Sequence, residues 1–196
     1  MSIDNLIKRL QNIMRQDSGV DGDAQRISQI VWVLFLKIYD SKEDLWELYD
    51  DNYESILPED LRWRKWAVDN KDGKAMTGEE LLTFVNDTLF PTLKSLEIDE
   101  TTPRKSAIVR EVFEDAYNYM KNGVLLRQVV NLIDDIDFTE IKERHAFNDI
   151  YETILKDLQS AGNSGEFYSP RATTDFIAEI INPQIGEIVA DYACGT

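Results

Sequence analysis

Residues 186–196 read Gly-Glu-Ile-Val-Ala-Asp-Tyr-Ala-Cys-Gly-Thr, and this stretch decides the fold expected for the end of the chain. An apolar run that ends in an acid, followed by a turn of small residues, is typical of a strand that leads into a cofactor loop. The sequence predicts a short buried strand over residues 185–190, preceded by a helix over residues 170–181. Helix, strand and glycine turn in this order begin an α/β domain. We therefore expect these 196 residues to be the N-terminal part of a longer protein.

The residues before this segment carry a helical pattern. Apolar residues recur at helical spacing from Ile3 onward, and residues 30–39 are apolar on nearly every side. A helix that is apolar all round lies at the centre of a bundle. The predicted fold class is mainly α, an N-terminal bundle of about six or seven helices followed by the start of the α/β domain. Helices are expected over residues 3–14, 23–47, 78–90, 103–120, 124–133 and 145–158.

Turn and cap residues indicate the boundaries of these elements. Asp23 is predicted to cap the long helix, and Thr77-Gly78-Glu79-Glu80 has the form of a capping box. Pro91 is expected to kink or end the helix that it follows. The run Ser-Ala-Gly-Asn-Ser-Gly at residues 160–165 predicts a hinge. The expected domains are an all-α unit at 1–160 and the start of a second domain at 161–196.

Composition indicates a folded protein of a reducing compartment. Hydrophobic residues make up 43% of the chain and aromatic residues 10%, which is enough to build a core. Cys194 is the one cysteine, so no disulfide framework can form within the chain. The start shows no signal peptide, and no apolar run approaches the roughly 20 residues of a membrane span. The sequence predicts a cytoplasmic protein with no membrane partner.

The net charge of −16 limits the partners that the chain can bind alone. A surface that binds a nucleic-acid backbone by itself carries a basic patch, because neutralised phosphates supply most of the non-specific affinity. The basic and aromatic run at residues 62–66, Arg-Trp-Arg-Lys-Trp, is the exception. It can stack on nucleic acid or clamp an acidic partner. The favoured alternative is that Trp63 and Trp66, on one helix face, pack in the core while the cations point outward.

Two short motifs near the end of the chain point to a ligand. Asp191 is expected at the carboxyl end of a strand, where open α/β sheets bind their ligands. Phe167 and Tyr168 can form a flat apolar wall, and the helix that begins at Pro170 offers free N–H groups. This set suits a zwitterionic or nucleoside-like cofactor. Each motif alone is weak, because an acid before a glycine turn is more often a plain turn.

Together, and about 25 residues apart, the two motifs are more specific. Residues 165–171, Gly-Glu-Phe-Tyr-Ser-Pro-Arg, resemble the Gly-Gln-Phe/Tyr-Tyr/Phe-Thr-Pro-Arg signature of amino-group DNA methyltransferases. Residues 191–196, Asp-Tyr-Ala-Cys-Gly-Thr, resemble their Asp-Pro-Ala-Cys/Ala-Gly-Thr/Ser-Gly-Gly motif for S-adenosylmethionine. Order and spacing match the modification subunit of type I restriction–modification systems, in which a helical domain precedes a Rossmann-like methyltransferase core. The resemblance spans the chain and is sharp over residues 160–196.

The resemblance implies which residues hold the cofactor. Phe167, Tyr168, Ser169 and Pro170 would line its methionine and adenosine side, and Asp191 would hold its ammonium group. Ser169 keeps the hydroxyl of the usual Thr, whereas Tyr192 replaces the usual Pro and changes the turn. The catalytic Asn/Asp-Pro-Pro-Phe/Tyr motif is absent from these residues, and Asn182-Pro183 is interpreted as a loop. The predicted cofactor-binding residues are Glu166, Phe167, Tyr168, Ser169, Pro170, Arg171, Asp191, Gly195 and Thr196.

The resemblance also implies a function and partners. The parent protein would transfer a methyl group from S-adenosylmethionine to adenine N6 in double-stranded DNA, after base flipping. It would work with a specificity subunit, a restriction subunit and a second copy of the modification subunit, and its helical domain would help to enclose DNA and contact subunits. Residues 1–196 alone are expected to be inactive. Two alternatives are an all-α interaction module without a cofactor and the N-terminal part of a single-chain type IIG-like enzyme.

Three other features receive structural interpretations. His145 is the one histidine, and the sequence gives it no partners for a metal site. Cys194 is read as a small turn residue rather than a nucleophile. Asp134, Asp135 and Asp137 lack the spacing of a calcium loop and predict a solvated helix end. No metal ligand is predicted.

Overall fold

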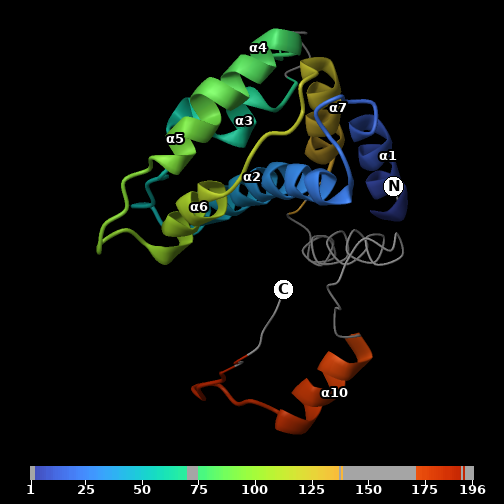
Figure 1. The fold of residues 1–196 in the computed structure, drawn as a ribbon. Helices are drawn as coiled ribbons and strands as arrows, with labels where there is room; N and C mark the ends of the chain where they lie inside the picture. Colours follow the sequence, from blue (N-terminus) through green and yellow to red (C-terminus); the bar gives the residue numbers. More distant parts are fainter. Residues whose placement is uncertain (1–2, 70–74, 137, 139–170, 191, 193–196) are drawn as a thin grey trace. The chain divides into compact units, whose positions relative to one another are not determined.

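A computed structural model describes residues 3–69, 75–136, 138, 171–190 and 192 of the chain (Figure 1). The chain forms two compact units, residues 1–155 and 156–196, which are described separately. All regular secondary structure in the described part of the first unit is helical. The elements are α1 (Ile3–Met14), α2 (Asp23–Tyr49), the 3-10 helix η1 (Glu59–Leu61), α3 (Trp63–Trp66), α4 (Gly78–Thr83), the π-helix η2 (Phe84–Leu89), α5 (Phe90–Lys94), α6 (Arg104–Glu114) and α7 (Gly123–Asp134). The mainly α fold is confirmed.

Helix α2 is the centre of the first unit, as its all-round apolar sequence predicts. Ile30, Val33 and Leu34 are at most 1% exposed. Figure 1 shows α1 and α7 near the beginning of α2 and α6 beside its second half. Aromatic contacts join these helices, since the ring of Phe113 in α6 lies 6.2 Å from that of Phe35 and 5.1 Å from that of Phe90. Burial of such large side chains supplies most of the stabilisation of the unit.

The beginning of α2 differs from its prediction. Asp23 is the first helical residue, and the N-cap is Gly22 at φ 91°. A positive φ suits glycine, and it places the start of the helix after this residue. The carboxylate of Asp23 pairs with Arg26 one turn later instead of capping the backbone. A negative charge in the first turn still favours the helix dipole.

Helices α4, η2 and α5 follow one another without a break, and Pro91 lies in the first turn of α5. The helix does not end at Pro91, because α5 continues to Lys94; a π-helical stretch, η2, precedes this residue. π-helical turns are rare and occur mostly as single bulges inside α-helices. Thr77 is the N-cap of α4, as the capping box predicts, but its side chain makes no capping hydrogen bond.

Helix α6 ends at Glu114, so the helix predicted over residues 103–120 is too long. The segment after α6 is extended, and side chains that are distant in the sequence hold it in place. The backbone N–H of Tyr119 donates to Gln29 Oε1 at 3.0 Å, and that of Lys121 donates to Asp17 Oδ1 at 3.0 Å. Asn118, 6% exposed, accepts from Gln29 Nε2. These side chains replace the helical hydrogen bonds, so the apolar spacing of residues 116–120 does not produce a helix.

The described part of the second unit contains one helix, α10 (Arg171–Ile181), as predicted. The strand predicted over residues 185–190 is not formed, and residues 187–190 have no regular secondary structure. A β-strand needs hydrogen bonds from a neighbouring strand, and the described residues offer none. These residues are exposed in this structure, which corrects the expectation of burial.

Candidate functional site

In the sequence, the predicted cofactor residues flank the described part of the second unit. Arg171 is the first residue of α10. Glu166, Phe167, Tyr168, Ser169, Pro170, Asp191, Gly195 and Thr196 lie outside the described residues, as do His145, Cys194 and the predicted hinge. The backbone that connects the two motifs, residues 171–190, is described. Its geometry can therefore be compared with the sequence prediction.

A tight turn follows α10. Asn182 closes the helix with φ 41°, and its N–H donates to the carbonyl of Ala178 at 2.8 Å. The Gln184 N–H donates to Glu187 Oε2 at 2.9 Å, while the Glu187 N–H donates to the Gln184 carbonyl at 3.1 Å. Gly186 has φ 97°, a conformation that favours glycine. The interpretation of Asn182-Pro183 as a loop is confirmed.

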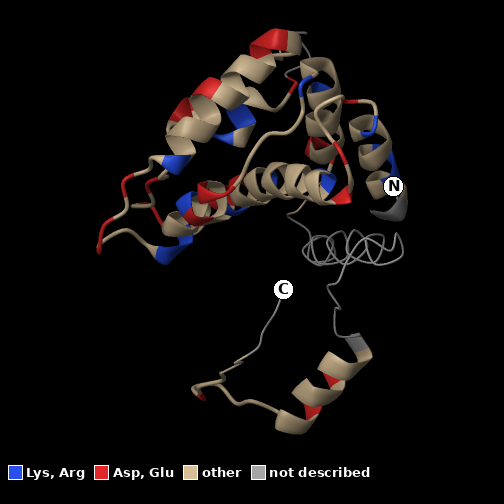
Figure 2. Cartoon of the chain, viewed as in Figure 1, with Lys and Arg blue, Asp and Glu red and all other residues tan. Residues whose placement is uncertain are grey.

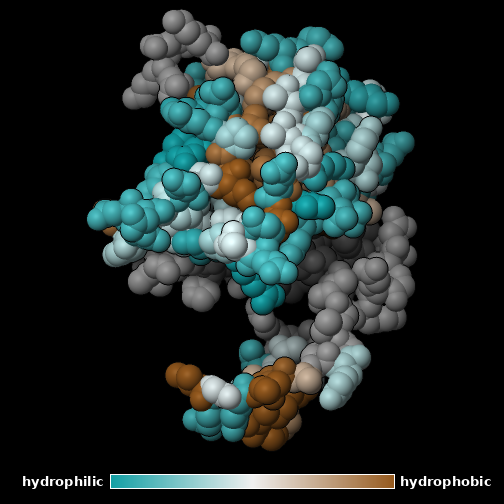
Figure 3. Space-filling model, turned by 90° about the vertical axis from the view of Figure 1, so that its left-hand side faces the viewer, coloured by the Kyte–Doolittle hydropathy of each residue, from teal (hydrophilic) through white to brown (hydrophobic). Residues whose placement is uncertain are grey.

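Helix α10 carries an apolar face that nothing in the described part of its unit covers. Phe176 is 61% exposed and Ile180 67%, and Ile177 and Ile181 lie on the same side at helical spacing. Figure 3 shows this surface in brown. The helix thus has the amphipathic form of one that packs against a sheet.

The basic and aromatic run at residues 62–66 belongs to the structure of the first unit. Trp63 is 1% exposed and Trp66 3%, and their rings pack edge to face with centroids 5.2 Å apart. Trp63 Nε1 donates to Asp134 Oδ1 at 2.7 Å and Trp66 Nε1 to the Leu61 carbonyl at 3.1 Å. The packing interpretation of this run is confirmed.

The cations of the same run are paired with carboxylates of the protein. Arg64 binds Asp40 at 2.8 Å and Glu47 at 3.3 Å, and Arg62 binds Glu47 at 2.7 Å. Burial acts to lower the pKa of Arg64, but the hydrogen bond to Asp40 and the nearby negative charges outweigh it, and the net shift is upward. Arg64 therefore stays charged and is held on α2. These cations are not free to neutralise phosphates.

The acidic group at the end of α7 also has a structural role. Asp134 Oδ1 accepts from Lys37 Nζ at 2.8 Å and from the indole of Trp63. This links α7 to α2 and α3. Among the described residues, no group of three or more His, Cys, Asp or Glu side chains could hold a metal ion. Asp137 lies outside the described residues.

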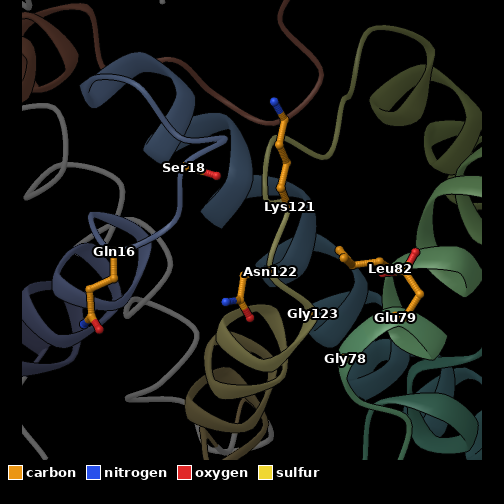
Figure 4. Close-up of a pocket in the computed structure, with 8 residues that line it drawn as sticks. All are labelled: Gln16, Ser18, Gly78, Glu79, Leu82, Lys121, Asn122 and Gly123. Atoms are coloured by element: carbon orange, nitrogen blue, oxygen red, sulfur yellow. The ribbon is translucent and has the colours of Figure 1, made fainter.

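One open hollow of about 380 Å³ lies where α4 and α7 begin (Figure 4). The side chain of Lys121 extends away from Glu79 (Figure 4). Asn122 Oδ1 accepts from the N–H groups of Val124 and Leu125, so the first donors of α7 are already used. The carboxylate of Glu79 opposes an anion there. The hollow is lined by Gln16, Ser18, Gly78, Glu79, Leu82, Lys121, Asn122 and Gly123.

Comparisons with known proteins connect both units to one kind of protein. A family model described as the HsdM N-terminal domain matches residues 3–133, and one described as N-6 DNA Methylase matches residues 142–196. The methylase subunit of the type I restriction enzyme EcoEI of Escherichia coli is 56% identical over all 196 residues. The StySPI methylase subunit of Salmonella potsdam is 27% identical over 186 residues. These spans cover 39% and 30% of the two relatives, respectively.

Solved structures agree with this result. A modification subunit of a putative type I restriction enzyme from Vibrio vulnificus matches with a TM-score of 0.79 and 35% identity, over 94% of this chain and 41% of that one. A structure on the assembly and conformational transition of the type I system matches with a TM-score of 0.78 and 34% identity, over 99% of this chain and 38% of that one. None of the helices in the described ranges is long and apolar enough to cross a membrane.

Proposed function

The chain belongs to the family of modification subunits of type I restriction–modification systems, and from this membership we propose that its parent protein is the DNA adenine-N6 methyltransferase of such a system. One observation carries the proposal. The helical family model and the N-6 DNA Methylase model match the same chain in sequence, and the second match contains both motifs, residues 165–171 and 191–196. The methyl donor is S-adenosylmethionine.

In this proposal the two motifs hold the cofactor from opposite sides. The Asp191 carboxylate binds the ammonium group of the methionine part, and the Gly195 and Thr196 backbone approaches it closely. Phe167 and Tyr168 contact the apolar parts, while Glu166, Ser169, Pro170 and Arg171 complete the loop. The hydrogen-bonded turn at residues 182–187 lies between α10 and Asp191 in the sequence. The exposed face of α10 is the surface that packs on the sheet of the complete domain.

The test uses the full-length protein, purified with its specificity subunit. Transfer of labelled methyl groups from S-adenosylmethionine to DNA adenine is measured. The change Asp191→Ala should weaken cofactor binding about 10–100-fold, because a charged hydrogen bond is lost. The matched control is Glu179→Ala, because Glu179 is an exposed acid on α10. This variant should bind the cofactor as the unchanged protein does. A complete complex that methylates no adenine would contradict the proposal.

Residues 1–196 alone are proposed to be inactive. They contain no Asn/Asp-Pro-Pro-Phe/Tyr sequence, which the family uses for the target adenine. They also supply only part of the proposed cofactor site, so we expect weak binding or none. Calorimetric titration of this polypeptide with S-adenosylmethionine tests the expectation. A micromolar dissociation constant would refute it.

The helical unit is proposed to help enclose double-stranded DNA within the complex and to contact other subunits. The proposed partners are the specificity subunit, the restriction subunit and a second modification subunit, in the cytoplasm. The net charge of −16 and the paired cations of α3 support this division of roles, because other subunits then supply most of the contacts to phosphate. The match over residues 142–196 favours a methyltransferase over a pure interaction module. Identity to type I methylase subunits favours a separate subunit over a single-chain type IIG-like enzyme.

A further inference from the structure

The last two turns of α2 carry an exposed apolar surface, which we call the Leu48 patch: Leu45, Leu48 and Tyr49. Residues at i, i+3 and i+4 lie on one helix face. Leu48 is 71% exposed and Tyr49 82%, and Leu45 is half-buried. The opposite face of the same turns is buried, with Glu43 at 0% exposure. Single exposed apolar residues are ordinary, but adjacent large ones on one face indicate a contact surface.

Unpaired negative charge adjoins this patch. Asp50, Asp51 and Glu54 follow it directly and are exposed. In the described part of the chain no Lys or Arg forms an ion pair with these three carboxylates, whereas Asp44 and Glu47 on the flank of α2 are held by Arg64. Figure 2 shows the acidic residues of the loops at this end of the first unit. The exposed Lys42 lies on the same side of α2, two turns before Tyr49.

The structure beneath the patch is fixed by contacts to the following loop. Glu43 Oε1 accepts from Tyr53 at 2.8 Å and from the hydroxyl of Ser55. Lys105 Nζ lies 4.9 Å from the ring centroid of Trp46 and 4.7 Å from that of Tyr53. These contacts tie the loop and α6 to α2. A surface held in this way loses little conformational entropy when a partner binds.

The negative charge beside the Leu48 patch indicates which kind of partner can bind there. Unpaired carboxylates repel DNA phosphates, anionic lipid and a second copy of a chain with net charge −16. They attract a segment with Lys or Arg beside its apolar residues. We propose that the Leu48 patch docks the apolar face of a basic amphipathic helix from a different protein subunit. The proposal rests on the proposed function in one respect, namely that this subunit belongs to the same assembly.

The first experiment identifies the occupant directly. The full-length protein is produced with the photo-crosslinking residue benzoyl-phenylalanine at position 48, assembled with the purified specificity and restriction subunits, and irradiated. The expected product joins position 48 to an apolar segment, flanked by Lys or Arg, of one of these two subunits. Position 124 is the matched control, because Val124 is 52% exposed on α7. Adducts to a second copy or to DNA, or no adduct above the control, would overturn the proposal.

The second experiment measures how tightly the crosslinked subunit binds to variants of the patch. The double change Leu48→Ser with Tyr49→Ser should weaken binding of the crosslinked subunit by roughly tenfold or more, since central apolar anchors dominate such contacts. The changes Asp50→Lys with Asp51→Lys should weaken it too and reduce its dependence on salt. Unchanged binding in both variants would refute the proposal. Methylation by the unmodified complex is assayed in parallel, so that failure of the proposed function is distinguished from failure of the docking site.

Discussion

Asp17 shows how one buried side chain holds distant parts of the first unit together. It is 4% exposed, and its carboxylate accepts from the backbone N–H groups of Gly19, Lys121 and Asn122. The change Asp17→Ala leaves these donors without their acceptor. We expect a loss of about 2–4 kcal/mol in the free energy of unfolding, measured by urea denaturation. Asp21→Ala, at an exposed position in the same loop, should change it by less than about 0.5 kcal/mol. Equal stability of the two variants would contradict the role of Asp17.

Asp99 is a residue for which the structure predicts a pH effect. Its Oδ1 accepts from the Thr101 hydroxyl and N–H and from Thr102, and these hydrogen bonds lower the pKa of Asp99 below its ordinary value. Because the folded pKa is lowered, the stabilisation of this turn is present above the unfolded value of about 3.9. It is lost as the pH falls through the folded pKa. Carboxyl ¹³C NMR titration should show the shift, and Thr101→Val should reduce it. An ordinary pKa in the unchanged protein would contradict the prediction.

At the scale of elements, the crossing of α4 and α7 depends on glycine. A Cβ atom added to Gly123 would lie 1.7 Å from the carbonyl oxygen of Gly78. Backbone cannot move aside as a flexible side chain can. The change Gly123→Ala should therefore separate the two helices and cost about 3 kcal/mol, the upper part of the range for overpacking. Thermal unfolding followed by circular dichroism measures the effect.

The control for this prediction is Val124→Ala, at the next position of α7, where the side chain is 52% exposed. It should leave the melting temperature nearly unchanged. If the Gly123 variant has the same melting temperature as the control, the backbones of α4 and α7 can separate without cost. The crossing would then be less tight than the structure indicates.

The sequence predicts the elements that are governed by local pattern. Helices α1, α2 and α7 and the burial of Trp63 and Trp66 follow from apolar spacing alone. The end of α6 does not, because Gln29 and Asp17, about 90–105 positions away in sequence, supply the hydrogen bonds of the extended segment after it. Periodicity contains no information about such partners.

The sequence likewise predicts only part of the cofactor site. The motifs at residues 165–171 and 191–196 predict the family, which is confirmed. The roles of their side chains stay predictions, because the structure describes only Tyr192 and the backbone of Arg171 among these residues. The strand over residues 185–190 was expected from its apolar composition. A strand depends on its neighbours in the sheet, and the described residues supply none.

At the scale of the whole molecule, the division into domains can be tested by truncation. The described helices of the first unit share one hydrophobic core, from Leu6 to Phe138. We expect residues 1–160 to fold alone and to unfold in one cooperative transition, because a domain with its own core is independently stable. Differential scanning calorimetry should place its melting temperature within about 5 °C of that of the same unit in residues 1–196. A broad transition, or none, would contradict the boundary.

The π-helix η2 has a consequence for comparing relatives of this protein. A π-turn contains one more residue than an α-turn. Residues 84–89 therefore contain one inserted position relative to a regular α-helix. If all six of these residues were wound as a regular α-helix, everything after them would be rotated by about 100° around the helix axis. Phe90 and Leu93, now buried, would then face another direction. Alignments should therefore open a one-residue gap at this point wherever a relative has a regular helix, and no compensating gap should appear before the end of α5.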